Sequence, residues 1–131
     1  MLCFGARATI ERQCPSDTLW AVAGQPRLIE SGNPTSDVHS SDDRAPRTAV
    51  GVRSNGTLLI TVVDGRQWHS PGLTLAALAR LMLEHEVEDA LNLDGGGSST
   101  LVIEGIVMNG PIHTRIPMRE RPVPVHLGFS Y

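Results

Sequence analysis

The chain has 131 residues, of which 40% are hydrophobic, and a formal net charge of -3. This length and composition predict one globular domain rather than a disordered tail. All 11 basic residues are arginines and 14 residues are acidic, so the charge balance argues against a nucleic-acid partner. No stretch approaches the ~20 apolar residues of a membrane span. The first residues also lack a signal-peptide pattern, which leaves the compartment open.

The first part of the chain predicts a short N-terminal segment followed by a long polar loop. We divide the sequence into a segment at 1–19, a candidate for truncation, and a domain at 20–131. Two short strands are expected around the turn Gly24-Gln25-Pro26. The polar stretch at 31–46 is longer than most connections, which predicts a functional or mobile loop.

The two cysteines, Cys3 and Cys14, both lie in this N-terminal segment. An oxidising compartment would join them in a disulfide, whereas a reducing compartment would leave two thiols. The sequence alone leaves both states open.

Two hairpins and a closing strand are expected in the rest of the chain. RTAVGV and TLLITVVDG are apolar, β-branched runs, and the Asn55-Gly56 pair between them is a strong hairpin signal. TLVIEGIVMN predicts a second hairpin that turns at Glu104-Gly105. VPVHLGF, near the C-terminus, predicts a closing strand.

The stretch LTLAALARLMLEHEVED has apolar residues at helical spacing, which predicts a helix over about 74–86 with Thr74 as its N-cap. With strands at 58–63 and 90–93 it predicts a βαβ unit, with parallel strands and a right-handed crossover. The expected fold is therefore α+β or mixed α/β. It would have a twisted mixed sheet with this one crossover, and hairpin strands at its C-terminal end.

This arrangement has a consequence for function. Asp64-Gly65-Arg66 follows the carboxyl end of the first strand of the unit, and the loop from Asp94 to Gly97 follows the second. Ligands of α/β sheets bind at that edge. We therefore expect two acidic loops to converge on a binding site.

The stretch NLDGGGSST, which begins at Asn92, is the most informative in the chain. It lacks the lysine and following helix of a nucleotide P-loop, and the strand-turn-helix context of a serine nucleophile. It also lacks the alternating carboxylates of a calcium loop. The five histidines show no metal-ligand spacing, although His69 and His113 could line a site. A plain turn needs one or two glycines, so three in succession favour close approach of the backbone to a ligand.

These segments together resemble the phosphodiester glycosidase family. The stretches APRTAVGV, LLITVVDGRQ, GLTLAALARLMLEHEVEDALNLDGGGSSTLVIEG and RPVPVHLG follow the order, and nearly the spacing, of that family's domain over about residues 20 to 130. The resemblance implies hydrolysis of a sugar joined through C1 to a phosphodiester, such as N-acetylglucosamine-1-phospho-6-mannose. A free sugar and a phosphomonoester would be released. We expect no cofactor and no metal.

The resemblance also carries functional residues onto matching positions. It implies Asp94 and Asp64 as the catalytic carboxylates. Arg66 belongs to an Asp-Gly-Arg form that is common in bacterial members but not universal. The implied substrate- or phosphate-binding residues are Arg47, Thr48, Gly65, Arg66, Asn92, Gly95, Gly96, Gly97, Ser98, Ser99 and Arg121.

Cleavage at an anomeric carbon passes through an oxocarbenium-like transition state, which an anionic carboxylate stabilises. We assign Asp94 as the acid/base or nucleophile, and Asp64 as its partner or as a ligand of a sugar hydroxyl. A phosphate leaving group needs charge stabilisation, and Arg47 and Arg121 are expected to clamp it. Each of the four also has a structural alternative, as a turn cap, a loop-holding residue or a solvated rim residue.

One departure from the family keeps other functions in view. The family's upstream Asn-Gly-Gly-aromatic-Phe segment lies outside this sequence, and Cys3-Phe4-Gly5 is no substitute. A non-catalytic module or inactive fragment that binds sugar phosphate or polysaccharide is therefore one alternative. A metal-dependent phosphodiesterase, in which Asp64 and Asp94 hold a divalent ion, is another. An open sheet edge covered by a second copy is the basis for a homodimer hypothesis.

Overall fold

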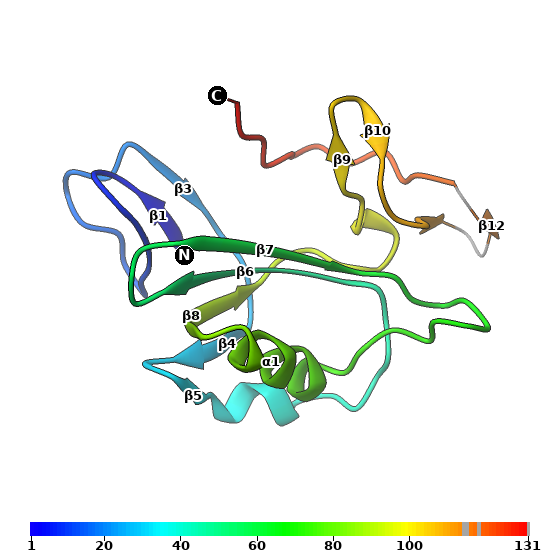
Figure 1. Ribbon diagram of the computed structural model, residues 1–131, viewed down its shortest axis with the longest axis horizontal. Helices are drawn as coiled ribbons and strands as arrows, with labels where there is room; N and C mark the ends of the chain where they lie inside the picture. The colour runs from blue at the N-terminus through cyan, green and yellow to red at the C-terminus, as the bar shows by residue number, and fades with distance from the viewer. Residues whose placement is uncertain (114–115, 118, 131) are drawn as a thin grey trace.

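The computed structural model describes residues 1–130 apart from residues 114, 115 and 118. Sheet dominates, and α1 is the one α-helix of this described part (Figure 1). In chain order the elements are β1 (Leu2–Phe4), β2 (Ala8–Ile10), β3 (Trp20–Val22), β4 (Arg27–Glu30), β5 (Asn33–Pro34), the 3-10 helix η1 (Ser36–His39), β6 (Arg47–Arg53), β7 (Leu58–Val63), α1 (Leu75–Glu84), β8 (Val87–Asn92), the 3-10 helix η2 (Gly96–Ser98), β9 (Val102–Ile103), β10 (Ile106–Val107), β11 (Ile112–His113) and β12 (Ile116–Pro117).

The central layer is a five-stranded sheet with the strand order β5-β4-β8-β6-β7. Helix α1 and the 3-10 helix η1 lie along one side of this sheet (Figure 1). A three-stranded sheet, with the order β2-β1-β3, packs on the other side through β2, which contacts β6 and β8. The small hairpins β9–β10 and β11–β12 lie beyond the sheet, on the side of its glycine-rich loop.

Helix α1 forms where the apolar spacing predicts it. The hydroxyl of Thr74 accepts a hydrogen bond from the backbone N–H of Ala77 at 3.1 Å, which confirms the predicted N-cap. The helix buries one stripe of side chains against the sheet: Leu75, Leu78, Ala79 and Met82. Gly51 lets the helix come close, because a Cβ there would lie 2.8 Å from Cε of Met82.

A second, smaller core forms on the opposite face of the sheet. Neighbouring residues of a strand point to opposite faces, so Ala49 packs into the helix-side core while Val50 packs into the other. Val50 and Leu91 meet Leu2 and Ile10 of the N-terminal sheet there. The cysteines are joined as the disulfide Cys3–Cys14, which answers the question that the sequence left open.

Both predicted hairpin turns are present. Gly56 has φ +85°, and the side-chain oxygen of Asn55 accepts from the N–H of Thr57, so the β6–β7 hairpin forms as expected. Glu104 and Gly105 both have positive φ at the β9–β10 turn. The polar loop at 31–46 has more structure than expected, since it contains β5 and η1.

The predicted closing strand VPVHLGF is wrong. Residues 123–129 have no strand assignment, and most of them are exposed. Pro122 and Pro124 explain the difference, because proline has no N–H to donate to a sheet ladder. The segment is held by side chains instead, as Leu127 packs against the second core and Phe129 makes an edge-on contact with Phe4.

The βαβ crossover is not confirmed in the expected form. β6 lies between β7 and β8 and pairs with both of them in the antiparallel sense, so the sheet is antiparallel rather than mixed. Two strands that are both antiparallel to a third run in the same direction. The carboxyl ends of β7 and β8 therefore still reach the same edge of the sheet, which is the feature that positions the site.

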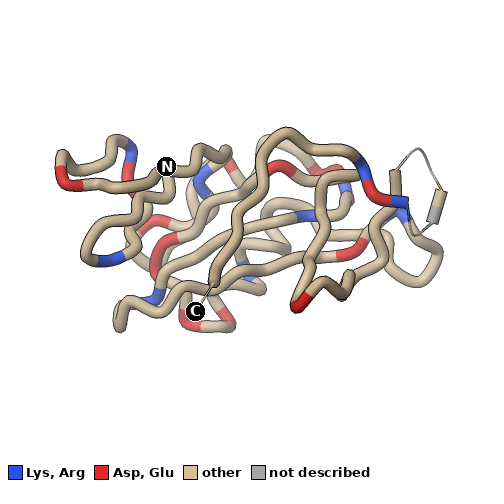
Figure 2. Tube along the Cα trace, turned by 90° about the horizontal axis from the view of Figure 1, so that it is seen from above, with Lys and Arg blue, Asp and Glu red and all other residues tan. Residues whose placement is uncertain are grey.

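Two surface properties bear on partners. Among the described residues, no helix has both the length and the apolar character needed to cross a membrane. Acidic and basic residues are interspersed along the chain in the view from above (Figure 2).

Candidate functional site

The loops after β7 and β8 meet at Pro46, the residue just before β6. Gly65 packs so closely against it that a Cβ there would lie 2.5 Å from the Pro46 nitrogen. From the other loop, the N–H of Gly96 donates to the Pro46 carbonyl at 2.9 Å. A Cβ on Gly95 would lie 3.0 Å from that same oxygen. The glycines thus allow three pieces of backbone to come together at one edge of the sheet.

Asp64 is largely committed to holding its surroundings in place. One carboxylate oxygen accepts from Nδ2 of Asn109 at 2.9 Å, and both oxygens lie 3.0 Å from the N–H of Gly110. Its backbone carbonyl accepts from the hydroxyl of Ser70. These bonds tie the segment after β10 to the end of β7, which favours a positioning role over direct attack on a substrate.

Asp94 contrasts with Asp64 in exposure and in partners. Its side chain is exposed, and within the described residues its carboxylate accepts one hydrogen bond, from the N–H of Gly95 at 3.0 Å. That leaves most of its acceptor capacity available. Of the two predicted carboxylates, Asp94 is the more exposed and has fewer hydrogen bonds to the described residues.

The glycine-rich loop uses most of its own backbone donors. The N–H groups of Gly95 and Gly96 bind Asp94 and Pro46, and those of Ser98 and Ser99 bind carbonyls inside the loop. The N–H groups of Asp94 and Gly97 have no partner among the described residues. The loop is therefore not a ring of free amides around an anion, and any negative charge here must be met by side chains.

Two arginines flank the loop. A Cβ on Gly96 would lie 3.1 Å from Nη2 of Arg66, and a Cβ on Gly97 would lie 3.5 Å from Cδ of Arg121. Both arginines are exposed, and neither guanidinium has a hydrogen-bond or ion-pair partner within the described residues. His113, whose Nδ1 lies 3.4 Å from the same position on Gly97, is also close. The two arginines place positive charge along the glycine-rich loop that follows Asp94.

Thr48 points to the face of the sheet away from α1, where it meets Ser99 of the glycine-rich loop. The hydroxyl of Thr48 donates to that of Ser99 at 3.1 Å, and Ser99 is only 1% exposed. The hydroxyl of Ser98 is buried without a partner among the described residues. The bond between Thr48 and the buried Ser99 therefore attaches the end of the loop to β6.

Arg47 points to the opposite face from Thr48, as alternation along β6 requires. Its Nε donates to the carbonyl of Leu73 at 3.0 Å, and its Nη2 donates to that of Asp43 at 2.7 Å. Burial lowers the pKa of Arg47 below its ordinary value, and the nearby Asp43 carboxylate partly offsets this. The Arg47 side chain therefore lies on the helix side of the sheet, whereas Arg121, with which it was expected to clamp a phosphate, lies against Gly97.

Asn92 lies on the same helix-facing side as Arg47. It is 8% exposed, and its Nδ2 donates to the carbonyl of Gln25 at 2.8 Å. Its Oδ1 is buried and accepts no hydrogen bond from a described residue. Asn92 and Arg47 both line a pocket of about 480 Å³ beside the start of α1.

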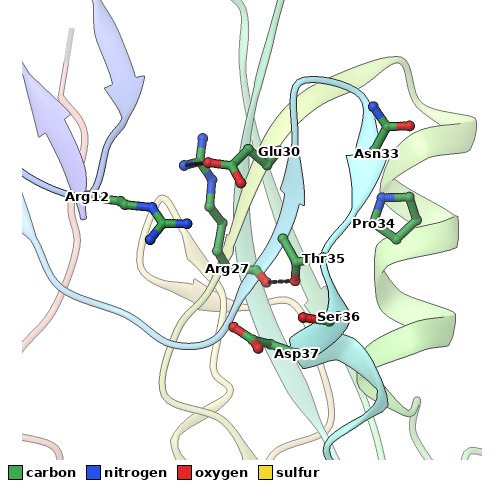
Figure 3. Close-up of a pocket in the computed structure, with 8 residues that line it drawn as sticks. All are labelled: Arg12, Arg27, Glu30, Asn33, Pro34, Thr35, Ser36 and Asp37. Carbon is green, nitrogen blue, oxygen red and sulfur yellow. Dashed lines mark hydrogen bonds and ion pairs between the residues drawn. The ribbon is translucent and has the colours of Figure 1, made fainter.

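A neighbouring pocket of about 560 Å³ lies between η1 and the N-terminal segment (Figure 3). Arg27 lines this pocket and forms ion pairs with Glu30 and Asp89, both at 2.6 Å. Arg27 and Asp37 line both pockets. In the described part of the chain, no group of three or more His, Cys, Asp or Glu side chains is arranged to hold a metal ion.

Sequence reasoning missed the residues that organise the Asp64 side of the site. Asn109 bonds Asp64, the carbonyl of Ser99 and the N–H of Leu101, so it links both loops and the hairpin. Gln67 adds a bond from Nε2 to the carbonyl of Gly110 at 2.7 Å. The Asn109-Gly110 pair is a turn signal, but nothing in the sequence shows that it faces a residue 45 positions away.

Comparisons with known proteins bear on this arrangement. The family model described as Phosphodiester glycosidase matches residues 6–130. An uncharacterized protein derived from the SPbeta prophage of Bacillus subtilis (strain 168) is 47% identical over 64 residues, which is 49% of this chain and 10% of that protein. The N-acetylglucosamine-1-phosphodiester alpha-N-acetylglucosaminidase of Bos taurus is 43% identical over 65 residues, which is 50% of this chain and 12% of that protein.

A solved structure supports the same relationship. It is the catalytic domain of the zebrafish N-acetylglucosamine-1-phosphodiester alpha-N-acetylglucosaminidase, auto-inhibited by its pro-peptide. The match has a TM-score of 0.60 and 31% identity, and covers 69% of this chain and 34% of that one. The chain thus spans about a tenth of the curated relatives it matches, and a third of this catalytic-domain chain. Because the family model matches nearly all of its residues, the chain belongs to the phosphodiester glycosidase family.

Proposed function

We propose that this chain hydrolyses a sugar-1-phosphodiester at the anomeric carbon, releasing a free sugar and a phosphomonoester. The observation that carries the proposal is the exposed carboxylate of Asp94 on a loop flanked by Arg66 and Arg121, whose guanidinium groups have no partner within the described residues. Family membership supplies the type of bond.

The flanking arginines suit the leaving group. A phosphodiester is an anion, and Arg66 and Arg121 each offer donors in the fork geometry that binds phosphate oxygens. A phosphomonoester has a second pKa near ~6, so it can leave as an anion without full protonation. Charge stabilisation by the two arginines grows as the bond breaks, which is what lowers the barrier.

Asp94 is suited to the sugar side of that bond. Positive charge develops at C1 as the C1–O bond breaks, and the bonding electron pair leaves with the phosphate. The Asp94 carboxylate stabilises that charge, or takes a proton from the water whose oxygen joins C1. Asp64 holds the segment at Asn109 and Gly110 in place, so that the loop geometry persists through the reaction.

The experiment is turnover of an N-acetylglucosamine-1-phosphodiester by the purified chain, followed by phosphorus NMR. We expect a phosphomonoester signal with the wild type, and its loss with Asp94→Asn. Glu88→Gln is the matched control, because it makes the same charge change at an exposed position on the other end of β8. A diaryl phosphate without a sugar should stay uncut. No turnover by the folded wild type, or equal turnover by Asp94→Asn, would overturn the proposal.

A further inference from the structure

The two edges of the five-stranded sheet differ in how they are protected. β5 forms one edge with only two residues, Asn33 and Pro34, and a short strand with a proline resists pairing with another chain. β7 forms the other edge, and its residues, Leu58–Val63, include no charge and no proline. Its register with β6 runs without a bulge, and no other strand of the described residues pairs with it (Figure 1). One edge is thus protected and the other is open.

The hairpin turn shows which backbone groups of β7 point outward. The N–H of Arg53 donates to the carbonyl of Thr57 at 3.0 Å, so these two residues form a hydrogen-bonded pair. Bonded and non-bonded pairs alternate along an antiparallel ladder, and the register from Thr57 onward has no shift. Leu58, Ile60 and Val62 therefore turn their N–H and C=O groups away from β6. No described residue bonds these six groups.

The side chains of these three residues share one face of the sheet, because strand residues alternate. It is the face away from α1, where Leu58 packs against the second core and Ile60 lies opposite Val50. Ile60 is 40% exposed and is the one exposed residue of β7. The open edge thus has an apolar, β-branched centre.

We propose that β7 pairs with β7 of a second copy of this chain, antiparallel and about a two-fold axis beside Ile60. Ile60 then faces Ile60 of the second copy, and Leu58 faces its Val62. Every outward N–H meets a C=O in this register, and each facing pair of side chains is apolar. A register shifted by two residues would leave either Leu58 or Val62 unbonded. The pattern of the strand is therefore complementary to itself, which favours a second copy over an unrelated strand.

The pairing also ends at two copies. It would join two five-stranded sheets into one of ten strands, whose two outer edges are both the protected β5. A two-fold interface closes on itself, so no open edge remains for a third copy. The inference does not depend on the proposed function, because Leu58–Val63 contribute no residue to the candidate site.

The test is sedimentation equilibrium of the purified chain over a wide range of concentrations. The wild type should change from monomer to dimer as its concentration rises. Ile60→Lys places two like charges face to face at the axis, and should raise the dissociation constant about 100-fold. Ile106→Lys is the matched control, because it makes the same change at an exposed isoleucine on β10 and should leave the dimer intact. Circular dichroism checks that both variants fold.

Two further measurements test the register itself. Ile60→Glu should be monomeric alone, whereas its mixture with Ile60→Lys should dimerise, because only a register centred on residue 60 brings the two new charges together. Hydrogen exchange needs no variant: the amides of Leu58, Ile60 and Val62 should become protected as the wild-type concentration rises. A wild type that stays monomeric with these amides unprotected would overturn the proposal. A dimer that persists in Ile60→Lys, or folded variants that stay monomeric when mixed, would overturn it as well.

Discussion

The loops after β7 and β8 each carry an aspartate followed by a glycine, but the two aspartates differ in exposure and in bonding. Asp64 is part-buried and is bound by Asn109 and Gly110, while its loop packs on Pro46 with no room for a Cβ at Gly65. Asp94 is exposed and bonds only its neighbour within the described residues. The difference shows that an aspartate in a family motif can serve to hold neighbouring backbone in place. Its hydrogen-bond partners are what identify that role.

The largest effect is expected from Asp94→Asn. If this loop supplies the reacting carboxylate, turnover should fall by about 10²–10⁴-fold, the usual contribution of a general acid or base. The thermal midpoint should stay close to that of the wild type, because the side chain is exposed and Asn keeps an acceptor for Gly95. Steady-state kinetics and a thermal melt check the two parts. A large drop in the midpoint would make Asp94 a structural residue and erase the contrast with Asp64.

Gly65→Ala tests how tightly the first loop packs. The new Cβ would lie 2.5 Å from the Pro46 nitrogen and 2.8 Å from the Ala45 carbonyl carbon, so backbone must move. We expect a loss of about 1–3 kcal/mol in the free energy of unfolding, measured with urea. Gly128→Ala, where a Cβ meets nothing within 4 Å, is the control and should be close to neutral. Equal effects of the two changes would mean that the loop adapts.

Asp64→Asn tests the hydrogen bonds that hold Asn109 and Gly110 in place, without changing the side-chain volume. Asn keeps one acceptor but turns an amide group toward the donors of Asn109 and Gly110, so a charge-assisted bond is lost. We expect a loss of about 1–2 kcal/mol in unfolding free energy, and a smaller loss of turnover than Asp94→Asn causes. Asp42→Asn, an exposed change of the same type, should be neutral. A catalytic defect equal to that of Asp94→Asn in a fully stable protein would contradict the positioning role.

The smallest effect is expected where the glycine-rich loop meets the sheet. Thr48→Val and Ser99→Ala each remove one side of a part-buried hydroxyl pair. A double-mutant cycle on unfolding free energy should show a coupling of about 0.5–1 kcal/mol. A coupling of zero would mean that the two hydroxyls act independently, and would leave backbone bonds such as Gly96 to Pro46 and Leu93 to Thr48 to attach the loop.

Much of the fold was predictable because its signals are local. Thr74 caps α1, and the Asn55-Gly56 and Glu104-Gly105 turns form as their residue types indicate, since each depends on a few neighbouring residues. The closing strand failed because the alternation in VPVHLGF outweighed its prolines in the prediction. The crossover is not confirmed in its expected form, because hydrophobic patterns do not reveal which strand lies between two others, and here it is β6.

The residues of the site could be predicted from the sequence. How their side chains divide between the two faces of the sheet could not. Shared strand direction brings Asp64 and Asp94 to one edge, as expected. The sequence could not show that alternation along β6 turns Arg47 to the helix side while Thr48 meets Ser99. Nor could it show that Arg66 lies against Gly96, or that Asn109 bonds Asp64, because both contacts join segments far apart in the chain.

Hydrolysis in water enriched in heavy oxygen tests the central claim most directly. The chain would be incubated with an N-acetylglucosamine-1-phosphodiester, and the released phosphomonoester examined by phosphorus NMR for the isotope shift. Attack at C1 beside Asp94 predicts a phosphomonoester that carries no heavy oxygen, because its own bridging oxygen leaves with it. Heavy oxygen in the phosphomonoester would show that the P–O bond breaks, and would contradict a glycosidase acting through Asp94.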